Sequence, residues 1–133
     1  MTRREAREAA FILLFEHCFK EDAPEETMAL AADAREMKIS AFGKGLFEGA
    51  VAKLSEVDAA LERALIRWEG DRLSRVARAA MRLCVYEMMF TELPAEIAVN
   101  EAIELIKRYD GEESASFANG VLGGVDKALK EQA

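Results

Sequence analysis

Proline occurs at only two positions of this 133-residue chain, Pro24 and Pro94, which leaves long stretches free to form helix. No stretch shows the sustained alternation of apolar and polar residues that marks a half-buried strand. Apolar residues instead recur at helical spacings of three and four positions, as they do over residues 11–18. The sequence therefore predicts an all-α fold, and its length predicts a single domain over residues 1–133.

The expected helices can be placed from their apolar stripes and from the residues that flank them. Ser40 and Asp71 are suitable N-caps, because their side-chain oxygens can accept hydrogen bonds from the first backbone N–H groups of a helix. Pro94 suits a first helical turn, and Gly111 suits the position just after a helix. We expect helices over about 3–20, 27–38, 40–54, 55–69, 71–90, 94–110 and 112 onward, with a division at 68–71 into halves of about 1–69 and 70–133.

The charge of the chain limits how it could bind nucleic acid. Its formal net charge is −7, whereas a non-specific binder is usually basic overall because neutralised phosphates supply most of its affinity. Positive charge exceeds negative charge only in residues 1–20 and 71–90. RNA could therefore bind only through a small local patch, weakly or with the help of a partner.

Several features predict a cytoplasmic protein that does not enter a membrane. The longest stretch without a charged residue, 114–125, is too short to span a bilayer. The chain begins with charged helical residues and not with the short apolar run of a signal peptide. Cys18 and Cys84 both lie in apolar surroundings and are expected to be reduced core residues.

No motif for catalysis, metal binding or cofactor binding is recognisable. His17 is the only histidine, and it lies about 100° around the helix axis from Cys18, so the two cannot form a nucleophile–base pair within that helix. The sequence has neither a Cys-x-x-Cys nor a Glu-x-x-His spacing, so zinc and di-iron sites lack their ligands. The glycine-containing stretches match no phosphate-binding fingerprint. We therefore predict no catalytic residues, no metal site and no cofactor.

The helix expected over 71–90 has one basic face. Helical spacing places Arg72, Arg75, Arg78 and Arg82 within a sector of about 120°. This face could bind a partner, or it could be solvated or paired with the acidic segments on either side. Glu87 falls on the opposite, apolar side, where a buried carboxylate needs a hydrogen-bonding or cationic partner, and Arg82 is the candidate.

Four motifs together resemble a known family. They read RREAREAAFILLFE at 3–16, LCVYE at 83–87, PAEIAVNEAIELIKRY at 94–109 and SFANGVL at 116–122. In this order and spacing the chain resembles the NusB family of bacterial transcription antitermination factors. The resemblance implies about seven helices in two small packed bundles. It also implies binding, without catalysis, of the single-stranded boxA segment of ribosomal RNA leader transcripts, together with NusE of the small ribosomal subunit, in an RNA polymerase antitermination complex.

The resemblance also implies roles for individual residues. Arginines at the start of the first helix would contact RNA phosphates, and the aromatic residue before Asn119 would stack on an unpaired base, with its neighbours beside it. The start of the arginine-rich helix would meet NusE. The RNA-binding positions are Arg3, Arg4, Arg7, Glu113, Ser116 and Phe117, and the partner-binding positions are Arg72, Arg75, Ala77 and Arg78.

Two positions depart from the pattern of the family. Glu5 and Ser116 stand where relatives often carry a basic residue, and both remove positive charge from the expected RNA path. For single-stranded RNA the salt slope is about −0.7 per neutralised phosphate, so we expect weak binding with a shallow slope. Three alternatives stay open: an interaction module that has lost RNA binding, a fragment resembling the NusB-like domain of an RNA-methylating enzyme, and a homodimer formed through the broadly apolar first helix.

The last expected helix carries a strip of small residues, Ser116, Gly120 and Gly124, at intervals of four. A glycine inside a helix costs roughly 0.5–1 kcal/mol relative to alanine, so such a strip indicates that something approaches the backbone closely. Packing of another helix is a more common reason for such a strip than ligand binding.

Overall fold

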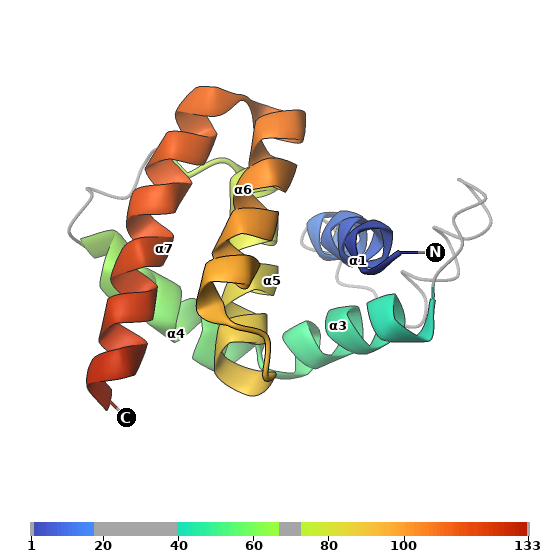
Figure 1. Cartoon of the computed structure of the whole chain (residues 1–133), viewed down its shortest axis with the longest axis horizontal. Helices are drawn as coiled ribbons and strands as arrows, with labels where there is room; N and C mark the ends of the chain where they lie inside the picture. The colour runs from blue at the N-terminus through green and yellow to red at the C-terminus, as the bar shows by residue number, and fades with distance from the viewer. Residues whose placement is uncertain (1, 18–39, 67–72, 133) are drawn as a thin grey trace.

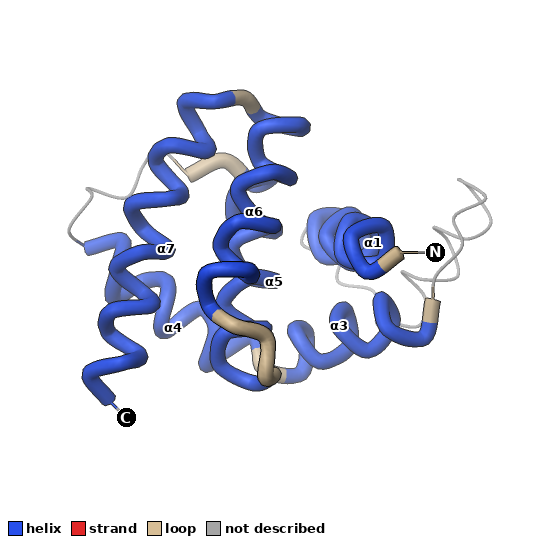
Figure 2. The backbone as a smooth tube through the Cα atoms, viewed as in Figure 1, coloured by secondary structure: helices blue, strands red, loops and turns tan. Residues whose placement is uncertain are grey.

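The computed structural model describes residues 2–17, 40–66 and 73–132. Within these ranges the chain forms six α-helices and no strand (Figure 2). The prediction of an all-α fold is therefore confirmed. The expected helix over 27–38 lies outside the described residues, as do Cys18, Asp71 and Arg72. The helices are α1 (Arg3–His17), α3 (Ala41–Ala52), α4 (Leu54–Leu65), α5 (Arg75–Phe90), α6 (Ala95–Asp110) and α7 (Glu112–Gln132).

The helices pack in two groups, with α1 and α3 in one and α4 to α7 in the other (Figure 1). The central helix is α5, which contacts all five of the others. Its two apolar sides explain this position, because Met81 and Val85 on one side and Leu83 on the other are all buried. Although α4 falls in the first half of the sequence, it packs mainly on α5 and α7 and so belongs with the second group.

The broad apolar face of α1 is used within the chain. Ala10, Phe11, Leu13 and Leu14 are all buried, and α1 packs against both α3 and α5. A helix that is apolar over more than one face needs two neighbours to cover it. The broad apolar surface of the first helix, which left a homodimer open, is therefore covered by helices of the same chain.

Local side-chain contacts fix where three helices begin. Thr2 and Glu5 form a capping box at α1, in which the backbone N–H of Glu5 donates to Thr2 Oγ1 (3.1 Å) and that of Thr2 donates to Glu5 Oε1 (3.0 Å). Ser40 caps α3 as predicted, through the N–H of Gly43. The N-cap of α5 is Ser74, so the expectation of a helix capped by Asp71 is wrong.

Gly111 makes the sharp turn between α6 and α7. Its φ of 96° lies in the left-handed region that favours glycine, and its N–H donates to the carbonyl oxygen of Ile106 at 3.0 Å. The two helices therefore run antiparallel and side by side, separated by a single residue (Figure 1). On the other side of α7, a Cβ atom added to Gly124 would lie 3.9 Å from that of Ala64 in α4, an ordinary packing contact.

Candidate nucleic-acid interface

Arg3 and Arg4 lie exposed in the first turn of α1. The N-terminal end of a helix carries a partial positive charge, so each cation placed there is unfavourable by about 0.3–1 kcal/mol. The same end attracts anions, because its first backbone N–H groups have no partner inside the helix. The helix dipole therefore does not account for these two arginines, whereas an anionic ligand would.

Arg3 lies over an aromatic ring. Its guanidinium carbon is 3.8 Å from the ring centroid of Phe42, in the first turn of α3. Arg7, one turn further along α1, is 5.3 Å from the same centroid. Stacking of this kind restricts a guanidinium group that would otherwise be mobile, and it leaves the charge in place. Arg3 is therefore held at the surface in one orientation.

Arg7 differs from its neighbours because it is buried, with 8% of its surface exposed. Its Nε donates to Glu87 of α5, at 3.0 Å from Oε1 and 3.1 Å from Oε2. This pair answers the need of Glu87 for a cationic partner, so the expectation that Arg82 would supply it is wrong. The expectation that Arg7 offers its charge to RNA phosphates also needs correction, because that charge is already bound inside the molecule.

A groove of about 520 Å³ separates the start of α1 from α6; we call it the α1–α6 groove. Arg4 crosses it to Glu101, with Nε 3.1 Å from Oε2. At the other end Glu8 accepts hydrogen bonds from Arg108 Nη1 (2.6 Å) and Tyr109 Oη (2.8 Å). Burial, and then the hydrogen bond to Glu8, raises the pKa of Tyr109. The groove thus carries charges of both signs, mostly paired across it.

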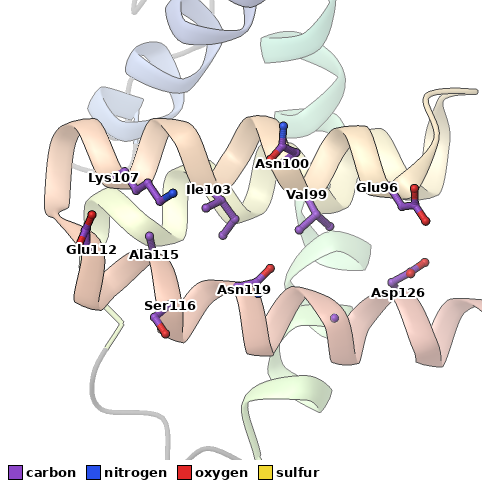
Figure 3. A pocket seen from close by; sticks show the side chains of 11 residues that line it. Glu96, Val99, Asn100, Ile103, Lys107, Glu112, Ala115, Ser116, Asn119 and Asp126 are labelled. Atoms are coloured by element: carbon purple, nitrogen blue, oxygen red, sulfur yellow. The ribbon is translucent and has the colours of Figure 1, made fainter.

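A second groove, of about 600 Å³, runs between α6 and α7; we call it the α6–α7 groove (Figure 3). Val99 and Ile103 point from α6 towards α7, and Asn119 points back across the gap. Ser116, a predicted RNA-binding residue, lines this groove near its Lys107 end. Lys107 also lines the α1–α6 groove, so it connects the two predicted groups of RNA-binding residues.

The predicted residues on α7 lie apart from those on α1. Glu113 and Ser116 are exposed in the first two turns of α7. Phe117 is half-buried and packs against the hydrophobic core. The structure therefore does not bring the Phe117 ring together with the arginines of α1, and α6 lies between the two groups.

The predicted partner-binding residues differ in how exposed they are. Arg75 is exposed, and Arg78 is partly exposed and pairs with Glu62 of α4, with Nη1 3.1 Å from Oε1. Ala77 is 2% exposed, so its predicted contact with a partner is wrong: the side chain faces the core. Arg82 pairs with Asp58, at 2.8 Å, which ties α4 to α5. Of the four expected positions, Arg75 is thus exposed and Arg78 partly exposed on this face, Ala77 is buried, and Arg72 lies outside the described residues.

Among the described residues, no group of three or more histidine, cysteine or acidic side chains is arranged to hold a metal ion. In the same part of the chain, no helix combines the length and apolar character needed to cross a membrane. Cys84 is buried and free, and burial raises the pKa of its thiol.

The sequence over residues 4–127 matches the model of the NusB family. The chain belongs to the NusB family. It is 39% identical to the transcription antitermination protein NusB of Bacillus licheniformis, over 98% of this chain and 100% of that protein. It is 37% identical to the protein of the same name from Clostridium botulinum strain Loch Maree, over 92% of this chain and 98% of that protein.

Solved NusB structures share the fold. The NMR structure of NusB from Aquifex aeolicus superposes with a TM-score of 0.84 at 29% identity and covers 99% of this chain and 93% of that one. A chain from a crystal structure of the antitermination factors NusB and NusE in complex with double-stranded RNA superposes with a TM-score of 0.82 at 30% identity, over 95% and 96% of the two chains. The resemblance inferred from the four motifs is therefore confirmed, and so is the NusB-like fold.

Reasoning from the sequence missed Phe42 and Lys107 as parts of this surface. Nothing local in the sequence shows that Arg3, 39 positions before Phe42, lies on the ring of that residue. Lys107 lies in the last turn of α6, where the helix dipole favours a cation, so its position in the sequence does not indicate a place between two grooves. The capping box of Thr2 and Glu5 was detectable, because its Thr-x-x-Glu spacing is a known helix start.

Proposed function

We propose that this protein is a transcription antitermination factor that binds the boxA segment of ribosomal RNA leader transcripts together with NusE, and that it acts with RNA polymerase. The observation that carries the proposal is the pair Arg3 and Arg4, exposed at the N-terminus of α1 where the helix dipole disfavours cations. Membership of the NusB family supports it, as does the likeness to a NusB solved with NusE and RNA.

The proposed RNA path starts at α1 and continues over α6. Arg3 and Arg4 contact phosphates, Lys107 continues the positive charge between the two grooves, and Ser116 and Glu113 lie at the far end on α7. Phe117 is half-buried, so base stacking at this position would use only the exposed part of its ring. We propose Arg7 as a support for this surface and not as a phosphate contact, because Glu87 holds its guanidinium group.

The ion pairs in the α1–α6 groove explain why the binding would be weak without a partner. Arg4 and Arg108 are already paired with Glu101 and Glu8, so a phosphate competes with a carboxylate for each of them. Glu5 adds negative charge close by. Its hydrogen bond in the capping box explains why a glutamate stands at this position. A protein partner that contributes positive charge would raise the affinity, which is the role we propose for NusE.

The alternative proposal is an interaction module that keeps the fold and has lost RNA binding. The specific observation in its favour is the near balance of charge in the α1–α6 groove, where Arg4, Arg7, Lys107 and Arg108 face Glu5, Glu8, Glu101 and Glu104. Under this alternative Arg75, which is exposed, and Arg78, which is partly exposed, would still bind NusE, and the RNA would add nothing.

Titration of labelled RNA tests the proposal. The boxA oligoribonucleotide, a scrambled strand of equal length and the boxA duplex are each titrated with the protein, with and without NusE. We expect the tightest binding for single-stranded boxA in the presence of NusE. Tighter binding of the duplex would contradict the single-stranded assignment. Binding of NusE without any RNA would support the alternative, and no RNA binding in either condition would reject the proposed function.

A charge-matched pair of variants then locates the site. Arg3→Ala/Arg4→Ala removes two exposed cations from α1, and Arg63→Ala/Lys127→Ala removes two from the opposite groove between α4 and α7. The first variant should lower the affinity for boxA and reduce the salt slope by about 1.4, at about 0.7 per phosphate contact. The second should change neither quantity. Equal effects of the two variants would place the RNA elsewhere.

A further inference from the structure

A pocket of about 410 Å³ opens where α1, α3 and the turn after α5 meet. Phe42, Leu46 and Leu93 give it apolar walls, and Arg3 lies at its edge on the Phe42 ring. We call it the Phe42 pocket. Its volume falls in the range of about 300–1,000 Å³ that small-molecule sites usually have. It is thus large enough for a flat aromatic ligand, and one of its walls is an aromatic ring under a guanidinium group.

We infer that the Phe42 pocket is a stacking site for one unpaired base of the bound RNA, with the Arg3 guanidinium, which lies over Phe42, as the platform. This inference rests on the proposed function. It assigns a base contact to Phe42, which the sequence did not indicate, and to Arg3, which the sequence indicated only for phosphates. Bases in single-stranded RNA stack on aromatic rings and on guanidinium planes alike. A base that stacks on Arg3 would continue the column that begins with Phe42.

The charges around the pocket favour a nucleotide. No carboxylate in the described ranges lies within ion-pairing distance of Arg3, so its charge is available for the phosphate beside a stacked base. The second guanidinium of the pocket, that of Arg7, is bound to Glu87, so the deeper wall is close to neutral. A neutral base inside and a phosphate outside match this distribution of charge.

The geometry also separates Phe42 from Phe117, the aromatic residue that the sequence singled out for base stacking. Both rings are half-buried and pack against the core, Phe117 from α7 and Phe42 from α3. Phe42 lies beside the exposed first turn of α1, where Arg3 and Arg4 are proposed to contact phosphates. A base in the Phe42 pocket would therefore be next to the proposed backbone contacts. Stacking is tolerant of sequence, so this site should bind any base with little preference.

Two lysine variants separate stacking from charge. Arg3→Lys keeps the positive charge but loses the planar group, and Arg4→Lys makes the same change at a residue that pairs with Glu101 and touches no ring in the described part of the chain. Both residues are exposed, so neither change should disturb folding. We expect Arg3→Lys to weaken boxA binding about ten-fold at an unchanged salt slope, and Arg4→Lys to weaken it much less.

Fluorescence shows the stacking directly. 2-Aminopurine is placed at one position of the boxA strand at a time, and each strand is titrated with the complex of this protein and NusE. Wild type should quench the fluorescence at one position, and Arg3→Lys and Phe42→Leu should both lose that quenching. Phe42→Trp should restore it. Phe90→Leu is the control, because the Phe90 ring lies under Lys53 (5.4 Å to the centroid), just after the last residue of α3, and does not line the Phe42 pocket.

The outcomes are distinct from those that test the proposed function. If wild type binds boxA but Arg3→Lys and Phe42→Leu bind and quench as wild type does, the stacking site is wrong while RNA binding stands. If Phe42→Leu lowers the melting temperature and NusE binding, Arg3→Lys decides the question alone, because it leaves the core untouched. If wild type binds no RNA with or without NusE, both proposals fail.

Discussion

Arg7 and Glu87 are joined inside the interface between α1 and α5, with Nε of Arg7 3.0 Å from one carboxylate oxygen and 3.1 Å from the other. The two residues are 80 positions apart in the sequence, and both are buried. The pair fixes the first turns of α1 against the central helix. It therefore fixes where the exposed arginines of α1 and the Phe42 pocket lie.

Breaking this ion pair on one side should be costly. Arg7→Met leaves the Glu87 carboxylate buried without a cation, which we expect to lower the free energy of unfolding by about 3–5 kcal/mol in urea denaturation. Arg7→Met/Glu87→Met should recover much of this loss, since no charge is then buried alone. Arg4→Met, at an ion pair whose arginine is 67% exposed, is the control and should cost about 0–1 kcal/mol. A double variant no more stable than the single one would contradict the coupling.

The capping box of α1 should make stability depend on acidity. The hydrogen bonds from the backbone and the hydroxyl of Thr2 hold the pKa of Glu5 below its ordinary value of 4.5. A lowered pKa in the folded state means that Glu5 stabilises the fold fully above about pH 4.5 and loses this effect as pH falls through the folded pKa.

Melting curves of wild type and Glu5→Ala between pH 3 and pH 7 test this prediction. Wild type should melt at a higher temperature above about pH 4.5, and the two curves should converge at the acidic end. Glu92→Ala, at an exposed glutamate in the turn between α5 and α6, should show no such convergence. If the difference in melting temperature between wild type and Glu5→Ala stays constant from pH 3 to pH 7, the Glu5 carboxylate does not act through its charge.

Two glycines of α3 should respond oppositely to alanine. A Cβ atom at Gly49 would overlap the hydroxyl group of Tyr86 in α5, whereas one at Gly45 would meet nothing within 4 Å. Gly49→Ala should therefore destabilise by about 1–3 kcal/mol. Gly45→Ala should stabilise by about 0.5–1 kcal/mol, because alanine loses less backbone entropy in a helix. Denaturant titration measures both, and Tyr86→Phe should relieve part of the cost of Gly49→Ala. Equal effects at the two positions would contradict the close approach of α3 and α5.

Charge reversal at the start of α5 should affect NusE binding more than folding. Arg75→Glu/Arg78→Glu breaks the surface ion pair with Glu62, which is worth about 0–1 kcal/mol. If this face binds NusE, the affinity should fall while the melting temperature changes little. Lys127→Glu/Lys130→Glu, at exposed positions near the end of α7, is the matched control and should leave binding intact. Unfolding of the α5 variant, or unchanged NusE binding, would rule out this docking surface.

The helices themselves could be predicted because their signals are local. Apolar stripes placed α1 and α5 to α7, and Ser40 marked the start of α3 through a hydrogen bond that spans three residues. Gly111 marked the turn after α6. The start of α5 was misplaced because two good N-cap residues lie three positions apart, and only the structure shows that Ser74, which also donates to Asp110, is the one used.

The sequence by itself determined the fold class, the family and the presence of arginines at the start of α1. Tertiary structure decided which of those arginines are available. Arg7 is bound by Glu87 and Arg4 by Glu101, 80 and 97 positions away, while Arg3 rests on Phe42. Helical spacing describes one helix at a time, so it shows which side chains share a face. It cannot show what that face contacts, because the contacting residues come from a distant part of the chain. In this protein those contacts make Arg7 part of a buried ion pair with Glu87 and leave Arg3 a cation at the surface over Phe42.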